Sequence, residues 1–260
     1  MQSILPKPPP LEVDTIDSHS VIVKDVVVSF DGFRALDITE FKVHFNDLRV
    51  VIGPNGAGKT TLCDVISGKT RPTSGWVYFN RTEITRALDA DIARLGVGRK
   101  FQTPTVFDSL TVYENMELAL PGRRGLFRNL WGRETAAQRE QILSVLERVH
   151  LLDVLHVPAR FLSHGQRQWL EMSMLIVADP KLLLVDEPAA GLTDKETELT
   201  AELLLELKGQ HTVIVIEHDM EFVRRLNSTV TVLNEGKILA EGSMDEVQRN
   251  PAVVEAYLGR

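Results

Sequence analysis

The chain has 260 residues, of which 43% are hydrophobic, and its formal net charge is −7. This hydrophobic fraction can fill a large core, and the acidic balance argues against a dedicated nucleic-acid binder, which usually presents a basic face. Cys63 is the single cysteine, so an intrachain disulfide is excluded. No apolar run approaches the roughly 18 residues of a membrane span, and prolines interrupt any N-terminal signal-peptide pattern. We therefore expect a soluble protein.

The N-terminal region predicts a tail followed by strands. Residues 1–20 are rich in proline and lack periodicity, which is typical of a flexible tail. The valine-rich residues 21–30 predict a strand, and residues 76–79 predict another after the turn at residues 71–75. We expect these strands to form a small antiparallel sheet.

Residues 53–60 match the pattern G-x-x-x-x-G-K-[ST]. A buried-strand pattern at residues 48–52 precedes them and a helical pattern at residues 60–67 follows, which is the context of a phosphate-binding loop. Glycines allow the backbone N–H groups to approach a phosphate, and the helix N-terminus adds partial positive charge. We expect Lys59 to reach the β- and γ-phosphates and the Thr60 hydroxyl to hold Mg²⁺. The alternative, a glycine-rich turn without a ligand, leaves the Lys–Thr pair unexplained.

The middle of the chain predicts a helical insert at residues 103–178. Gln102 lies where the core is expected to continue into this insert. We therefore expect one domain, with its core at residues 21–102 and 179–260. Apolar residues recur at helical spacing in the insert, at Ile142, Val145, Leu146 and Val149.

Two continuous apolar runs, at residues 182–185 and 213–216, predict central parallel strands that are buried on both faces. A predicted helix at about residues 195–208 connects them and completes a βαβ unit. The fold class is therefore α/β, with a mixed or parallel core sheet, an antiparallel β subdomain and the helical insert.

Two acids, Asp186 and Glu187, end the first of these strands. Carboxylates at a buried strand end are costly unless they meet a cation or a charged ligand. Beside a phosphate loop, Asp186 is expected to position Mg²⁺ and Glu187 to polarise the attacking water. The alternative is a pair of helix-capping acids.

Three further features have ordinary structural readings when they are taken alone. Ser163 and Gln166 fit the S-x-x-Q capping box, although a capped helix start with Gly165 is also an anion site. His218 follows a buried strand, where a structural histidine is the ordinary reading, and Phe30 would ordinarily be assigned to the core.

Taken together and in this order, the motifs over residues 21–260 resemble the ATP-binding subunit of an ABC transporter. The resemblance implies that residues 53–61 form the Walker A loop, residues 163–166 the signature and residues 191–194 the D-loop. It implies catalytic roles for Lys59, Gln102, Glu187 and His218, and Mg²⁺ binding by Thr60, Gln102 and Asp186. The implied ATP-binding residues are Phe30, Gly53, Pro54, Asn55, Gly56, Ala57, Gly58, Lys59, Thr60, Thr61, Ser163, Gly165, Gln166 and Asp194.

The signature departs from the family pattern L-S-G-G-Q at one position, where His164 replaces the first glycine. The stretch at residues 162–171 is similar to that of the urea-importer ATPases, specifically the D-type subunit of a system with two unlike ATPases. Residues 101–107, 217–223 and 254–260 agree with this similarity. The wider relatives are branched-chain amino-acid importers, so urea is the expected solute and branched-chain amino acids are the alternative.

The resemblance also implies partners. Two ATPase domains bind head to tail, as a homodimer or a heterodimer, and the signature of one closes on the nucleotide of the other. Two transmembrane permease subunits and, indirectly, a periplasmic solute-binding protein complete the importer. The chain is then expected on the cytoplasmic face of the plasma membrane, without nucleic acid. Phe101, Thr105, Val106 and Phe107 are candidates for the permease contact, with packing inside the insert as the alternative.

Two other functions account for fewer of these residues. A non-transport ABC ATPase of translation or DNA repair usually has two cassettes or a long coiled coil, whereas this chain has one phosphate loop and no sustained heptads. A nucleotide-binding regulator without hydrolysis needs neither Glu187 nor His218. Both alternatives are therefore less well supported than an ATPase that drives import.

Overall fold

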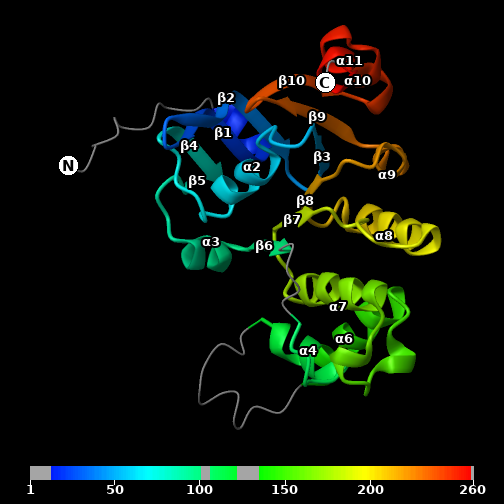
Figure 1. Ribbon diagram of the computed structural model, residues 1–260. Coiled ribbons are helices and arrows are strands. Elements are labelled where there is room, and N and C mark those ends of the chain that lie inside the picture. Colours follow the sequence, from blue (N-terminus) through cyan, green and yellow to red (C-terminus); the bar gives the residue numbers. More distant parts are fainter. Residues whose placement is uncertain (1–12, 101–105, 122–134, 259–260) are drawn as a thin grey trace.

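A computed structural model describes residues 13–100, 106–121 and 135–258, and the protein in this range is built around two sheets (Figure 1). One sheet is antiparallel with the order β2-β1-β4-β5, and the other has six strands in the order β10-β9-β3-β8-β7-β6. The first contains β1 (His19–Phe30), β2 (Phe33–His44), β4 (Ser74–Phe79) and β5 (Thr82–Glu83). The second contains β3 (Leu48–Ile52), β6 (Val97–Lys100), β7 (Leu182–Asp186), β8 (Thr212–Ile216), β9 (Thr229–Asn234) and β10 (Lys237–Gly242).

The six-stranded sheet is mixed, because β10 pairs antiparallel with β9 whereas the other pairs are parallel. Every residue of β3, β7 and β8 is buried, which explains the continuous apolar runs at residues 182–185 and 213–216. Parallel strands present their carboxyl ends at one edge of a sheet. The segments that follow β3, β7 and β8 therefore meet at that edge.

Helix α2 (Lys59–Ile66) packs between the two sheets. Its apolar residues Leu62, Cys63 and Ile66 are buried in the same cluster as Phe41 of β2 and Ile216 of β8. Burial also raises the pKa of the Cys63 thiol to about 12, so this cysteine is a core residue that stays protonated at neutral pH.

Residues 13–20, which we expected to belong to a flexible tail, have regular structure. Helix α1 spans Val13–Ser18, and β1 begins at His19. The His19 ring stacks on His44 with centroids 4.1 Å apart, and Asp17 pairs with Arg81 at 3.0 Å. These contacts come from β2 and from the turn after β4, so no local periodicity reports them. Residues 1–12 lie outside the described range.

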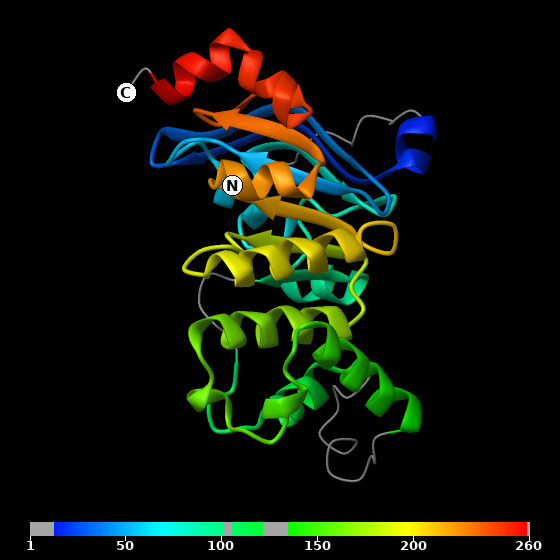
Figure 2. The ribbon, with the colours of Figure 1, turned by 90° about the vertical axis from the view of Figure 1, so that its right-hand side faces the viewer.

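A separate group of helices lies beyond β6 and β7, at the end of the molecule opposite the C-terminal helices (Figures 1 and 2). The predicted apolar residues Ile142, Val145 and Leu146 are buried in it. The indole N–H of Trp169 donates to Thr200 Oγ1 at 3.1 Å, which joins this group to helix α8 (Asp194–Leu207). The elements are α4 (Val112–Ala119), α6 (Ala136–Arg148), the 3-10 turns η1 (Leu152–Val154) and η2 (Ala159–Phe161), and α7 (His164–Val177).

The remaining helices flank the two sheets. They are α3 (Asp89–Leu95), α8 (Asp194–Leu207), α9 (Met220–Leu226), α10 (Met244–Arg249) and α11 (Pro251–Leu258). Among the described residues, no helix combines the length and apolarity that crossing a bilayer requires. Gln102 and the neighbouring Phe101 and Thr105 lie outside the described residues, so their expected positions stay predictions.

Candidate nucleotide site

The phosphate loop connects β3 to α2, as the pattern predicts, and β2 packs closely against it. Gly58 has φ 101° at the N-cap of α2. A Cβ on Gly58 would lie 2.7 Å from the carbonyl oxygen of Ala35 and 2.8 Å from Leu36 Cδ2. The Gly236 N–H also donates to the Ala57 carbonyl at 3.0 Å. The glycine is therefore required both by its backbone conformation and by the close approach of β2.

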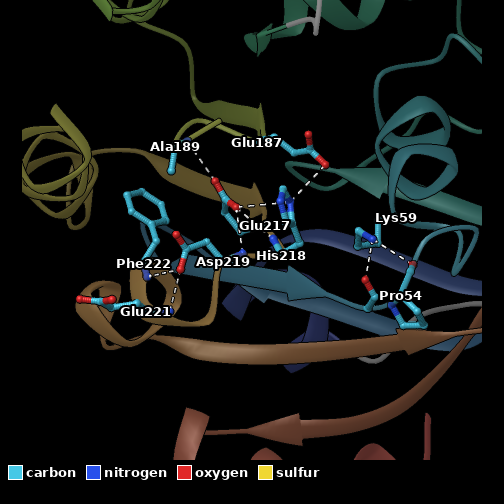
Figure 3. Close-up of polar contacts among 10 residues, drawn as sticks. Pro54, Lys59, Glu187, Ala189, Glu217, His218, Asp219, Glu221 and Phe222 are labelled. Atoms are coloured by element: carbon cyan, nitrogen blue, oxygen red, sulfur yellow. Dashed lines mark hydrogen bonds and ion pairs between the residues drawn. The ribbon is translucent and has the colours of Figure 1, made fainter. Parts of the chain in front are cut away.

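Lys59 is buried within this loop rather than extended into solvent. Its Nζ donates to the backbone carbonyls of Gly53 at 2.7 Å and Pro54 at 3.0 Å (Figure 3). Burial lowers the pKa of Lys59, and the carboxyl groups of Glu187 and Asp186 oppose that shift. The ammonium is thus held above the loop and faces the two acids at the end of β7.

The first turn of α2 supplies the hydroxyl groups of the site. Thr60 is exposed and follows Lys59, and Thr61 is half-buried beside it. The N-terminal amides of a helix carry partial positive charge and lack partners within the helix. Anionic oxygen atoms that bind at this turn would therefore meet amides, a hydroxyl and an ammonium together.

Asp186 ends β7 with a side chain that is 5% exposed. Within the described residues its Oδ1 is buried without a hydrogen-bond partner. Burial raises the pKa of Asp186, and the neighbouring Glu187 adds to that shift, while Arg99 and Lys59 oppose it. A buried carboxylate oxygen without a donor is costly unless a cation binds it. This oxygen therefore fits a Mg²⁺ ligand.

The described residues contain no cluster of three or more His, Cys, Asp or Glu side chains arranged to hold a metal. Mg²⁺ is usually bound through one or two carboxylates together with water and substrate phosphates, so a single carboxylate ligand beside a phosphate loop suits it. Asp186 and the Thr60 hydroxyl are the described groups that fit this ligand set.

Glu187 and His218 leave neighbouring strands and meet at the same edge of the sheet. Asp186 pairs with Ile216 in the β7–β8 register, and the Glu187 N–H donates to the Ile216 carbonyl at 3.0 Å. His218 Nδ1 lies 3.4 Å from Glu187 Oε1 (Figure 3). Glu187 has φ 48°, a left-handed conformation that is strained for this residue type and that recurs at functional sites.

The capping box predicted at the start of α7 is present. Ser163 Oγ accepts from the Gln166 N–H at 3.2 Å, and Gln166 Oε1 accepts from the Ser163 N–H at 3.0 Å. Gly165 faces the carboxylate of Glu196 on α8, where a Cβ would collide with it. A larger residue at this position would therefore require the Glu196 side chain to move.

His164 contacts the loop that follows Glu187 in its own chain. Its Nε2 lies 3.4 Å from the Ala190 carbonyl oxygen and 2.9 Å from Gln168 Nε2. The Cβ that Gly191 lacks would lie 3.1 Å from the same imidazole nitrogen. The residue that replaces a signature glycine therefore packs on the expected D-loop, whose Asp194 is exposed at the start of α8.

The candidate adenine residue lies in the hairpin between β1 and β2. Phe30 is 49% exposed and pairs with Phe33, which is 68% exposed, across the turn at Asp31 and Gly32. Such exposure leaves both rings available for stacking. The contact between Gly58 and residues 35 and 36 of β2 brings this hairpin to the phosphate loop.

Sequence reasoning missed one residue at this edge, Glu217. Its side chain is 1% exposed and accepts three backbone N–H bonds, from Ala189, His218 and Asp219. The available signal was an acid directly after a buried strand, the same signal that identified Asp186.

Comparison with known proteins agrees with this geometry. Residues 36–190 match the family model described as ABC transporter, and residues 237–260 match the model described as branched-chain amino acid ATP-binding cassette transporter. The chain is 35% identical over 246 residues to the high-affinity branched-chain amino acid transport ATP-binding protein LivG of Salmonella typhimurium, covering 91% of this chain and 96% of that protein. BraF of Pseudomonas aeruginosa, whose name carries the same description, matches with the same identity and coverage.

Two solved structures confirm the predicted fold class. The ADP conformation of MJ1267, an ATP-binding cassette of an ABC transporter, has a TM-score of 0.81 and 32% identity, covering 93% of this chain and 99% of that one. A nucleotide-free cassette from an ABC transporter has a TM-score of 0.80 and 30% identity, covering 93% and 100%.

The similar proteins are named for branched-chain amino acids, so they support the alternative solute and not the expected urea. The phosphate loop, the fold and the full-length relatives together leave one assignment: the chain belongs to the ABC transporter family, as an ATP-hydrolysing cassette of the branched-chain amino acid importer type.

Proposed function

We propose that this protein hydrolyses ATP at the edge formed by β3, β7 and β8 and thereby powers import of branched-chain amino acids. The observation that carries the proposal is the 3.4 Å contact between Glu187 and His218, opposite a buried Lys59 within the phosphate loop. An acid, a histidine and an ammonium around one anion site suit phosphoryl transfer to water.

In this proposal the nucleotide is bound by two parts of the chain. Phe30 stacks on the adenine, and the amides of residues 53–61 surround the phosphates. Lys59 exchanges its bonds to the Gly53 and Pro54 carbonyls for bonds to the β- and γ-phosphates, which are stronger because they join opposite charges.

Thr60, Asp186 and Gln102 would hold Mg²⁺, which would supply positive charge to offset the negative charge of the phosphates. Glu187 accepts a proton from the water that attacks the γ-phosphorus, and ADP leaves with the β–γ bridging oxygen. A positioned base of this kind contributes about 10²–10⁴-fold in rate. His218 orients Glu187 and donates a hydrogen bond toward the γ-phosphate.

The proposal includes a second cassette and two permease subunits. Ser163, Gly165 and Gln166 would complete the nucleotide site of a partner cassette, and Asp194 would lie at that interface. Residues 21–102 and 179–260 form the ATP-binding core, while residues 103–178 form a helical subdomain that contacts the permease on the inner face of the plasma membrane. Phe107 is 54% exposed and suits this contact, whereas Val106 packs against the helical core.

The solute is tested by reconstitution. The protein, its permease subunits and the solute-binding protein are assembled in vesicles with internal ATP, and uptake of labelled leucine and labelled urea is measured. We expect leucine uptake that depends on ATP and is lost with Glu187→Gln. Uptake of urea without leucine would replace the solute and keep the ATPase, whereas ATP-independent uptake would contradict the proposed function itself.

A further inference from the structure

Glu217 joins the two loops that carry the proposed catalytic pair. It follows β8, and its N–H donates to the Val51 carbonyl of β3 at 3.2 Å. Its Oε1 accepts from the Ala189 N–H at 3.0 Å, and its Oε2 accepts from the N–H groups of His218 at 3.0 Å and Asp219 at 3.3 Å (Figure 3). Both oxygens act as acceptors, which is the capacity of a carboxylate.

A buried carboxylate is expensive, so its retention needs a physical reason. Glu217 is 1% exposed, and the buried Lys100 at the end of β6 feels its charge together with those of Glu171 and Asp186. The three backbone N–H donors and the nearby Lys100 ammonium offset the free-energy cost of desolvating the Glu217 carboxylate. An apolar residue would avoid the desolvation of a carboxylate, but it would leave the N–H groups of Ala189, His218 and Asp219 without this acceptor.

The bond to Ala189 crosses from one loop to the other. Ala189 lies two residues after Glu187, and His218 follows Glu217 directly. The β7–β8 ladder ends at the Asp186–Ile216 pair and the bond from the Glu187 N–H, so beyond that point the two loops depend on side-chain contacts. Asp219 adds a second restraint downstream, because its Oδ1 caps α9 at the N–H groups of Glu221 and Phe222.

We propose that Glu217 is a positioning residue for ATP hydrolysis: its carboxylate ties the loop of Glu187 to the turn of His218 and so maintains their contact. The inference rests on the proposed roles of Glu187 and His218. Because a displacement of about 1 Å at a reacting group can cost roughly 10²-fold in rate, such a tie matters without touching the nucleotide.

Two substitutions of Glu217 distinguish its hydrogen bond with Ala189 from its hydrogen bonds with His218 and Asp219. Glu217→Gln keeps the length, but its NH₂ group must face one of the three N–H donors. Glu217→Asp keeps the charge and can still accept from the nearby Asp219 amide, but it is too short to reach Ala189. We expect both variants to lower kcat by about 10- to 100-fold, and to leave KM for ATP within about twofold because the phosphate loop is unchanged.

The experiment uses the assembled transporter, where the closed dimer exists, and the matched control is Glu221→Gln on the same segment. Glu221 is 77% exposed and pairs with Arg225, so its variant should keep wild-type rates. The backbone amide resonance of Ala189, followed by NMR in the purified subunit, should shift in Glu217→Gln and stay unchanged in the control, because this N–H donates to Glu217 Oε1. A merely structural role would lower the melting temperature without changing kcat at a temperature where the variant is folded.

Combining substitutions tests whether Glu217 acts through the pair. In a His218→Ala background, Glu217→Gln should lower kcat by less than about threefold, because effects through a shared group are not additive. Folded Glu217→Gln and Glu217→Asp variants with wild-type kcat would overturn the inference, as would failure of both to fold. If Glu187→Gln and His218→Ala also hydrolyse ATP normally, the proposed site is wrong; if they do not, only the role of Glu217 is lost.

Discussion

The side-chain amide of Gln168 donates a 2.8 Å hydrogen bond to the backbone carbonyl of Ala190. Gln168 lies on α7, which begins at the signature, and Ala190 lies in the loop after Glu187. The same amide nitrogen lies 2.9 Å from His164 Nε2. The helical group and the catalytic edge are therefore linked within one chain, at the residue that departs from the family signature.

His164→Gly should fold, because the capping box of Ser163 and Gln166 does not involve the imidazole. We expect unchanged ATP affinity in the monomer and a change of about 2- to 10-fold in dimer-dependent hydrolysis, the size of one net hydrogen bond. Gln168→Ala, which removes the bond to the Ala190 carbonyl, should change dimer-dependent hydrolysis in the same sense as His164→Gly. Equal effects on monomer binding and on hydrolysis would contradict the placement of this residue near a partner cassette.

Glu187→Gln should bind ATP and lose most hydrolysis, because an amide keeps the shape of the carboxylate but cannot accept the proton. Losing a general base lowers the rate by about 10²–10⁴-fold. Phosphate release is measured in the assembled transporter, with nucleotide binding measured separately. Release near the wild-type rate would remove Glu187 from the mechanism.

Phe30→Ala should weaken ATP binding with little change in stability, because the ring is half exposed. Base–aromatic stacking is worth about 1–3 kcal/mol in alanine substitutions, or roughly 5- to 150-fold in affinity. Phe33→Ala is the matched variant across the same turn, and we expect its affinity to be near wild type. The reverse ranking in a binding titration would assign the adenine to Phe33.

Asp186→Asn should abolish Mg²⁺-dependent hydrolysis and stabilise the nucleotide-free protein. Burial raises the pKa of Asp186 above its usual value of 3.8, so ionising this carboxyl costs folding free energy. The cost is absent below about the unfolded pKa, develops as the pH rises toward the raised folded pKa, and is complete above it. An asparagine at position 186 does not ionise, so this cost in folding free energy is absent at every pH.

The check is thermal unfolding of both proteins from acidic to neutral pH without nucleotide. The melting temperature of Asp186→Asn should exceed that of the wild type increasingly as the pH rises, and then by a constant amount. A wild type that is the more stable protein at neutral pH would show that Asp186 is compensated in the free subunit.

A cysteine at Phe107 should crosslink to a cytoplasmic loop of the cognate permease, because this exposed ring is proposed to contact it. The native Cys63 need not be replaced, since burial raises its pKa to about 12 and keeps it unreactive at neutral pH. A cysteine at Glu40 on β2 is the negative control. Absence of crosslinks at Phe107 in a transporting complex would exclude this contact.

The sequence alone determined the fold class and most of the candidate site. Residues 182–185 and 213–216 are apolar throughout because parallel central strands are buried on both faces, and Gly58 belongs to the phosphate-loop pattern of residues 53–60. The helix cap at Ser163 can also be predicted from the sequence, because Ser163 and its partner Gln166 lie three residues apart. Each of these patterns reports a local rule, so no partner from a distant part of the chain is needed to recognise it.

The tertiary structure decided the contacts between distant segments. The ion pair of Asp17 with Arg81, the bond from Ala189 to Glu217 and the contact of His164 with Ala190 join residues far apart in the sequence. The sequence shows an acid before His218, but only the parallel pairing of β7 with β8 brings it under the loop of Glu187. Burial and orientation of a polar side chain depend on which strands become neighbours, and no local periodicity specifies that.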